Sequence, residues 1–271
     1  MGRIKMIALD MDGTLLNSKR QVSDKNRDAL HEALDRGIII ALSSGRSLST
    51  IIPIAKELGV VGPVVSCNGA YTVDKDHVEV THHGLSEEAR DFVLDFAEGS
   101  GVHTNFYSRE KVLFATETPF MYEYSQRTGV PTMVNNIPTY VGFQHLKSMI
   151  PTKIVFMDTP ARVSEINDHM RSKLPETFAE IALSEIDYIE FLPKNVNKGM
   201  GVMEIAAHLG ISQEETAALG DYYNDFEMIQ WVGYGGAVGN ALPEVKAAAD
   251  IVVSSNNEDG AAEFIKICLG L

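Results

Sequence analysis

Two aspartates stand directly after a short apolar segment, in the sequence Asp10-Met11-Asp12-Gly13-Thr14. Residues 4–9 are apolar apart from Lys5, a pattern typical of a strand buried on both faces of a parallel sheet. Parallel sheets bind ligands at the carboxyl ends of their strands, and Gly13 lets the chain turn so that both acids reach that edge. A solvated acidic turn explains this segment alone equally well. An EF-hand is excluded, because position 12 counted from Asp10 is Gln21.

A second acidic group, Gly220-Asp221-Tyr222-Tyr223-Asn224-Asp225, follows an expected strand at 216–219. Several carboxylates at one sheet edge repel one another unless a cation lies between them. Oxygen ligands of this kind suit Mg²⁺. For Asp221 or Asp225 alone, capping of a helix before Phe226 is as good an explanation as metal binding, and Asp225 is the stronger candidate for a structural role.

Two further segments could bind an anion. Ser43-Ser44-Gly45-Arg46 ends the expected strand at 38–42 and precedes an expected helix at 47–58. Hydroxyls and backbone N–H groups at a helix start bind phosphate, although ordinary serine capping fits the same residues. Lys198 opens an expected helix at 198–209 and could place a positive charge beside the same edge, although a single lysine at a helix start is usually solvated.

The order of the predicted elements defines two domains. Strands and helices alternate up to residue 66 and again from residue 197, which predicts a doubly wound, Rossmann-like α/β fold with a parallel sheet. Between them, an amphipathic helix at 86–101 and several short strand candidates predict an inserted α+β domain. We therefore expect a core made of 1–84 and 190–271, interrupted by an insertion at 85–189.

The composition argues against several classes of function. The 271 residues carry a formal charge of −14, which argues against binding to nucleic acids or to anionic membranes. The two cysteines, Cys67 and Cys268, cannot form a disulfide framework and suggest a reducing compartment. With no signal peptide or membrane-spanning segment in evidence, a cytoplasmic location is expected.

Taken together, the four segments resemble the motifs of the haloacid dehalogenase superfamily, in the family's order. These motifs are Asp-x-Asp-Gly-Thr, a Ser or Thr after the second strand, a Lys, and Gly-Asp-x-x-Asn-Asp. The insertion, with Ser66-Cys67-Asn68-Gly69-Ala70, is similar to the Cof-type branch, which has a large α/β cap of type IIB. Two residues depart mildly from the pattern: Ser44 stands where this branch often has Thr, and Tyr222 where a small residue or Asn is common.

The resemblance implies a mechanism. Asp10 would attack phosphorus and form an aspartyl phosphate, while Asp12 would act as general acid and base. Mg²⁺ would be held by Asp10, the backbone carbonyl of Asp12 and Asp221. Gly13 and Thr14 would shape the loop. The residues implied for the phosphate pocket are Ser44, Gly45, Lys198 and Asn224, with Asn68 and Arg46 as neighbours.

The expected function is Mg²⁺-dependent hydrolysis of a small phosphorylated metabolite, such as a sugar phosphate or a phosphorylated cofactor. Two alternatives stay open from the sequence. One is a phosphotransferase or phosphomutase on the same scaffold, and the other is a non-catalytic binder of a phosphorylated ligand. The substrate, the cap residues that set specificity and the oligomeric state are not determined by the sequence.

Overall fold

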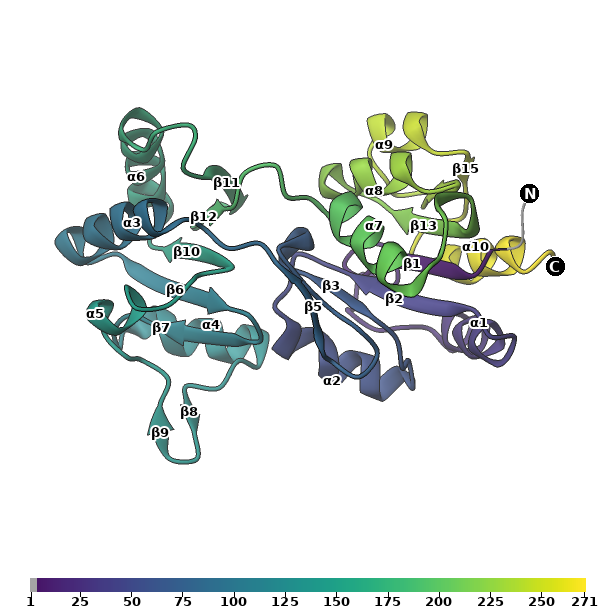
Figure 1. Cartoon of the computed structure of the whole chain (residues 1–271), viewed down its shortest axis with the longest axis horizontal. Helices are drawn as coiled ribbons and strands as arrows, with labels where there is room; N and C mark the ends of the chain where they lie inside the picture. Colours follow the sequence, from purple (N-terminus) through teal and green to yellow (C-terminus); the bar gives the residue numbers. More distant parts are fainter. Residues whose placement is uncertain (1–3) are drawn as a thin grey trace. The chain divides into compact units, whose positions relative to one another are not determined.

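The computed structural model describes residues 4–271, which divide into two compact units (Figure 1). The core unit comprises the described residues up to 46, together with 51–81 and 197–271. The inserted unit comprises 47–50 and 82–196. Residues 1–3, with which the expected core domain begins, lie outside the described part of the chain.

An eight-stranded sheet forms the centre of the core unit, in the order β15-β14-β13-β1-β2-β3-β4-β5. The pairs from β15 to β3 are parallel, as predicted, and β3 pairs antiparallel with β4. Strands β4 and β5 are neighbours at the edge of this sheet. The strands are β1 (Met6–Asp10), β2 (Ile39–Ser43), β3 (Val64–Ser66), β4 (Tyr71–Val73), β5 (Glu79–His82), β13 (Thr216–Gly220), β14 (Tyr234–Ala237) and β15 (Ile251–Val252).

Both faces of β1 are buried, which explains why its residues before Asp10 are apolar. Met6 and Ala8 pack against Val202 of α7 and Met228 of α8, and Ile7 and Leu9, which alternate with them, are also fully buried. Helices α1 and α10 pack against each other. The core helices are α1 (Asp24–Asp35), α2 (Leu48–Leu58), α7 (Lys198–Leu209), α8 (Phe226–Trp231), α9 (Pro243–Ala248) and α10 (Gly260–Cys268).

The ends of α1 follow from local chemistry. The Ser23 side chain accepts a hydrogen bond from the Asn26 N–H at the start of α1, and Gly37 follows the helix with a φ of 79°. Within residues 4–271, no helix is both long and apolar enough to cross a membrane.

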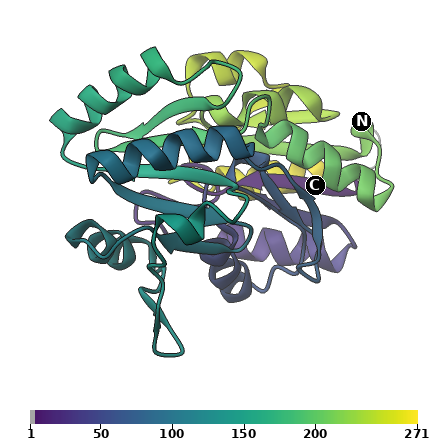
Figure 2. The ribbon, with the colours of Figure 1, turned by 60° about the vertical axis from the view of Figure 1, so that its left-hand side comes forward.

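The inserted unit contains a five-stranded antiparallel sheet in the order β11-β12-β10-β6-β7. Helices α3 and α6 lie along one face of this sheet (Figure 2), where Val93 and Met170 join a core with Phe106, Phe156 and Phe191. The strands are β6 (His103–Ser108), β7 (Lys111–Phe114), β10 (Lys153–Met157), β11 (Glu180–Glu185) and β12 (Tyr188–Leu192). The helices are α3 (Glu87–Ser100), α4 (Pro119–Thr128), α5 (Phe143–Leu146) and α6 (Pro160–Lys173).

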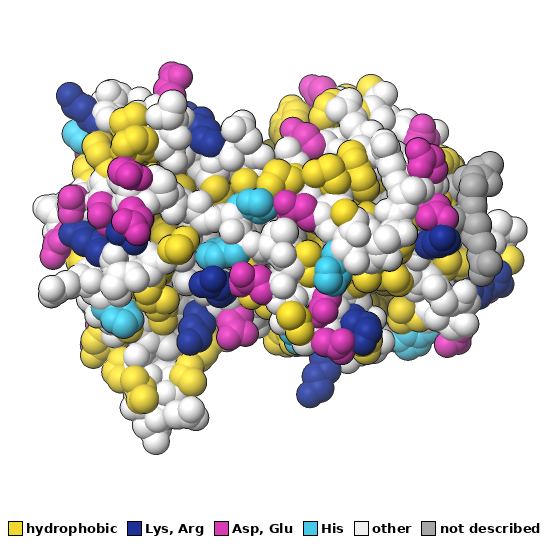
Figure 3. All heavy atoms as spheres, in the orientation of Figure 1, with side chains coloured by type: hydrophobic (Ala, Val, Ile, Leu, Met, Phe, Trp, Pro, Cys, Tyr) yellow, Lys and Arg dark blue, Asp and Glu magenta, His cyan; other side chains and the backbone are white. Residues whose placement is uncertain are grey.

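A two-stranded ribbon, β8 (Met133–Val134) and β9 (Ile137–Pro138), extends from the inserted unit. Its turn residues Asn135 and Asn136 both have positive φ angles, 52° and 64°, as a two-residue type I′ hairpin requires. Met133 and Ile137 are mostly exposed, and Figure 3 shows hydrophobic side chains over this ribbon.

Candidate active site

Asp10 lies at the carboxyl end of β1, where its side chain is buried. Its Oδ1 accepts a hydrogen bond of 2.6 Å from Lys198 Nζ. Its Oδ2 is buried and has no hydrogen-bond donor among residues 4–271. A buried carboxylate oxygen without a partner is costly unless a ligand completes its coordination, so this atom faces a ligand position.

Lys198 is the first residue of α7, and its side chain is 1% exposed. Its Nζ donates to Asp10 Oδ1 and to Asp225 Oδ1, each at 2.6 Å. Glycines let α7 approach this closely. A Cβ at Gly199 would lie 2.7 Å from the Glu227 backbone, and one at Gly201 would lie 2.9 Å from the Gly69 Cα. The lysine that the sequence places near the crevice is therefore at the centre of the charge cluster.

Asp225 is completely buried, and hydrogen bonds occupy both of its carboxylate oxygens. Oδ1 accepts from Lys198, and Oδ2 accepts from the backbone N–H groups of Asp221 (2.9 Å) and Tyr222 (3.1 Å). Its side chain does not cap α8, which starts at Phe226, but closes the turn that precedes that helix. Of the two roles left open by the sequence, these contacts favour the structural one.

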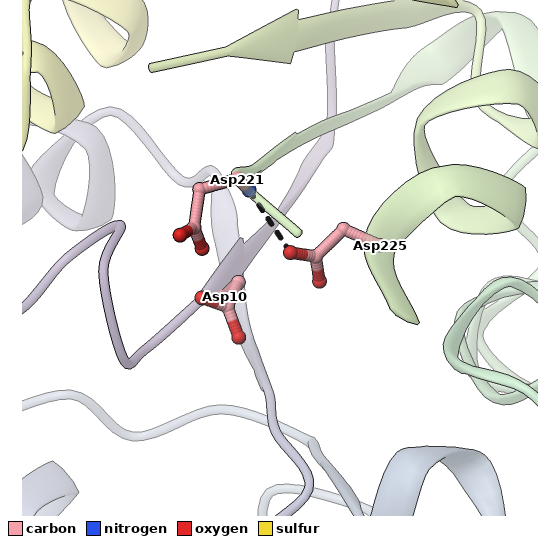
Figure 4. A group of neighbouring side chains, drawn as sticks. All are labelled: Asp10, Asp221 and Asp225. Carbon is pink, nitrogen blue, oxygen red and sulfur yellow. Dashed lines mark hydrogen bonds between the residues drawn. The ribbon is translucent and has the colours of Figure 1, made fainter. Parts of the chain in front are cut away.

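The carboxylates of Asp10, Asp221 and Asp225 meet at the carboxyl ends of β1 and β13 (Figure 4). One oxygen from each lies within 4.8 Å of the others. Asp221 Oδ1 also accepts a hydrogen bond of 3.0 Å from Thr14 Oγ1. Because Asp225 is fully engaged, Asp10 and Asp221 are the carboxylates with oxygen atoms to offer. An all-oxygen donor set of this kind fits Mg²⁺.

The pKa values of these groups reflect the crowding of negative charge. Burial raises the pKa of Asp10 well above its usual range, and Asp225 raises it further, while Lys198 opposes both effects. The pKa of Asp221 is also raised, first by burial and then by Asp225. Burial by itself would lower the pKa of Lys198, but Asp10 and Asp225 outweigh burial and raise it. Three acids around one lysine leave a net negative site that a divalent cation would balance.

Asp12 lies on the loop after β1, and its side chain is 49% exposed. Arg46 binds this carboxylate through two parallel hydrogen bonds of 2.6 Å, from Nε to Oδ2 and from Nη2 to Oδ1. Such a bidentate pair fixes the orientation of a carboxylate. Arg46, expected beside the phosphate, is thus bound to the proposed acid–base residue.

The remaining predicted residues form a polar group beside Asp10. Ser44 is buried and directly follows β2, whose last residue, Ser43, pairs in register with Asp10. The Asn68 N–H donates to the Ser44 carbonyl at 3.0 Å, and Asn224 Nδ2 donates to Asn68 Oδ1 at 2.9 Å. A Cβ at Gly45 would lie 3.1 Å from Asn68 Oδ1. The structure therefore brings Ser44, Gly45, Asn68 and Asn224 together.

Two asparagines at this site were not predicted from the sequence. Asn197 caps α7 by accepting from the Met200 N–H at 2.9 Å, which the residue type before Lys198 could have signalled. Asn240 donates from Nδ2 to the Gly13 carbonyl at 2.8 Å, and no pattern around Asn240 predicts this contact.

The chain is similar in sequence and in fold to proteins of a known family. Residues 7–265 match the sequence profile of the haloacid dehalogenase-like hydrolases. The 5-amino-6-(5-phospho-D-ribitylamino)uracil phosphatase YcsE of Bacillus subtilis is 31% identical over 264 residues, covering 97% of this chain and 95% of the relative. Phosphatase YwpJ of the same organism is 30% identical over 288 residues, covering 97% and 99%. The crystal structure of a haloacid dehalogenase-like hydrolase from Bacteroides thetaiotaomicron is similar with a TM-score of 0.86 and 27% identity, covering 97% of this chain and 99% of that one.

Proposed function

Because the chain belongs to the haloacid dehalogenase-like hydrolases and is a phosphatase, we propose that it hydrolyses a small phosphorylated metabolite with the aid of Mg²⁺. The observation that carries this proposal is the state of Asp10, which lies near Asp221. Lys198 binds one of its carboxylate oxygens, and the other has no hydrogen-bond partner within residues 4–271. The substrate is a sugar phosphate or a phosphorylated cofactor. The relative YcsE, whose name specifies a phosphoribityl substrate, supports this size and class.

Asp10 is the proposed nucleophile. A carboxylate oxygen attacks phosphorus, the bond from phosphorus to the ester oxygen breaks, and an aspartyl phosphate forms. Water then attacks phosphorus, which releases inorganic phosphate and restores the carboxylate. Lys198 supports this role because its ammonium group favours the ionised form of Asp10 and orients it.

Asp12 is the proposed general acid and base. It gives a proton to the departing ester oxygen and later takes a proton from the attacking water, a role worth about 10²–10⁴-fold in rate. Its exposed position on the loop after β1 leaves the carboxylate accessible to a leaving group. The pair with Arg46 sets its orientation before the substrate binds.

The phosphoryl oxygens would be bound by the Ser44 hydroxyl, the Gly45 backbone N–H, Lys198 and Asn224, with Asn68 orienting Asn224. Mg²⁺ would be held by Asp10, Asp221 and the backbone carbonyl of Asp12. When bound, it supplies positive charge that keeps these acids ionised and reduces repulsion between Asp10 and an anionic substrate.

A phosphate-release assay tests this function. The wild-type protein is incubated with phosphorylated sugars and cofactors, with Mg²⁺ or with EDTA, and both phosphate and organic product are quantified. We expect Mg²⁺-dependent release of phosphate in stoichiometric yield, and loss of activity in Asp10→Asn. Asp35→Asn, an exposed acid at the end of α1, is the matched control and keeps wild-type activity.

Three results would contradict the proposal. The first is absence of Mg²⁺-dependent turnover across the whole panel. The second is full activity of Asp10→Asn. The third is transfer of the phosphoryl group to an added sugar without release of phosphate, which would identify a phosphotransferase or mutase instead.

A further inference from the structure

The loop after β1 is attached to the far end of the core sheet by asparagines that the proposed reaction does not use. Asn256, which follows β15, is 7% exposed and donates from Nδ2 to the Leu16 carbonyl at 2.9 Å. Its backbone N–H donates to Asn240 Oδ1 at 2.8 Å, and Asn240 Nδ2 donates to the Gly13 carbonyl. The two asparagines therefore hold both ends of the segment 13–16.

The opposite side of the same segment is held by Asp221. A Cβ at Gly13, whose φ is 87°, would lie 2.4 Å from Asp221 Oδ2, so the chain there is pressed against the acid. Thr14 Oγ1 donates to Asp221 Oδ1. Leu15 and Leu16 are buried, which anchors the end of the segment. Asp12 immediately precedes this segment, so its position relative to Asp10 depends on how the segment is held.

We propose that Asn240 and Asn256 are positioning residues that place Asp12 for the proton transfers of the proposed phosphatase reaction. The inference rests on the proposed function, since it concerns the acid–base step. The bond from Asn240 to Gly13 is exposed to solvent, so it contributes little to folding but restricts the peptide that follows Asp12. A displacement of about 1 Å at a reacting group can cost about 10²-fold in rate.

Three variants separate the hydrogen bonds that these two asparagines make. Asn240→Asp keeps an acceptor for the Asn256 N–H but replaces the donor toward Gly13 with a second acceptor. Asn240→Ala removes both contacts. Asn256→Ala removes the donor toward Leu16. The matched control is Asn26→Ala, because Asn26 is also buried and its Oδ1 accepts from the N–H of Ala262 in α10 rather than from the loop.

Steady-state kinetics with p-nitrophenyl phosphate and Mg²⁺, and hydrogen exchange of the amides of 12–18, test the proposal. We expect kcat to fall about tenfold in both Asn240 variants and about 10–100-fold in Asn256→Ala, the range typical for residues that orient an active group. KM and inhibition by inorganic phosphate stay within about twofold of wild type, and exchange of the loop amides becomes faster. Asn26→Ala loses stability but keeps the wild-type kcat and loop exchange.

Wild-type kcat in Asn240→Asp overturns the proposal, as does an equal fall of kcat in Asn26→Ala. Failure of the proposed function has a different signature, because the wild-type protein itself would then release no phosphate. Hydrogen exchange still decides in that case, since unchanged exchange at 12–18 in the asparagine variants overturns the positioning role without reference to turnover.

Discussion

Each unit of the molecule buries a lysine beside acid, but in different surroundings. In the inserted unit, Lys153 of β10 pairs with Glu190 of β12 at 2.9 Å, in the middle of a sheet. In the core unit, Lys198 lies at a helix start and the end of a strand, between Asp10 and Asp225 and near Asp221. The first arrangement pairs opposite charges. The second leaves an excess of negative charge and, in the described part of the chain, an Asp10 oxygen without a hydrogen-bond partner. Excess negative charge at strand ends, rather than burial of charge as such, therefore distinguishes the candidate active site from the ion pair of the inserted unit.

The largest expected effect is a loss of activity on replacing Lys198 that does not occur on replacing Lys153. Lys198→Met should lower kcat by about 10³-fold or more, because Asp10 loses the cation that orients it. Lys153→Met should destabilise the protein by about 3–5 kcal/mol, since the largely buried carboxylate of Glu190 loses this cation, but the folded protein should keep its kcat. Turnover with saturating Mg²⁺ and chemical denaturation of each variant measure the two effects. A comparable loss of kcat in both variants would remove the distinction.

A second prediction concerns the Lys153–Glu190 pair itself. The double variant Lys153→Met with Glu190→Leu should recover most of the roughly 3–5 kcal/mol lost by Lys153→Met alone, because no unpaired buried charge remains. A double-mutant cycle by urea denaturation measures the recovery. If the double variant is as unstable as the single one, charge pairing is not what holds these residues.

A third prediction concerns how the stability of the inserted unit depends on pH. Burial lowers the pKa of His103, on β6, to about 4 from 6.5. The unfolded chain therefore binds this proton at a higher pH than the folded one, and stability falls as the pH drops from 6.5 toward 4. The loss approaches about 3 kcal/mol, and His103→Gln should remove this part of the pH dependence. Unfolding free energies at pH 7 and pH 4 for both proteins provide the measurement; identical slopes would contradict it.

The smallest expected effect is a pH dependence of stability opposite in sign to that of His103. The raised pKa values of Asp10 and Asp221 mean that folding disfavours their ionised forms, so without metal the fold loses stability as the pH rises through those values. Asp221→Asn keeps an acceptor for Thr14 and removes one charge, and should raise stability in EDTA at neutral pH by about 1 kcal/mol. It should also abolish the increase in Tm produced by Mg²⁺. Thermal unfolding with and without Mg²⁺ tests both outcomes, and a destabilised variant in EDTA would show that charge crowding is not costly.

Much of the fold could be read from local patterns. The apolar strand at residues 4–9 and the amphipathic helix at 86–101 depend on patterns that act over a few residues, and β1 and α3 lie at these positions. The order of four polar segments also placed Asp10, Ser44, Lys198 and Asp221 at one edge, because parallel strands bring their carboxyl ends together.

Residue types and spacing therefore predicted phosphatase chemistry, and they predicted that Asp10, Lys198 and Asp221 would meet at one edge of the sheet. The tertiary structure decided how those groups are paired: Lys198 with Asp10, 188 residues away, Arg46 with Asp12, and Asn256 with the Leu16 carbonyl. The physical reason is the distance along the sequence over which each interaction acts. Periodicity and capping are satisfied within a few residues, whereas these hydrogen bonds exist only after the sheet has assembled and glycines have let α7 approach it.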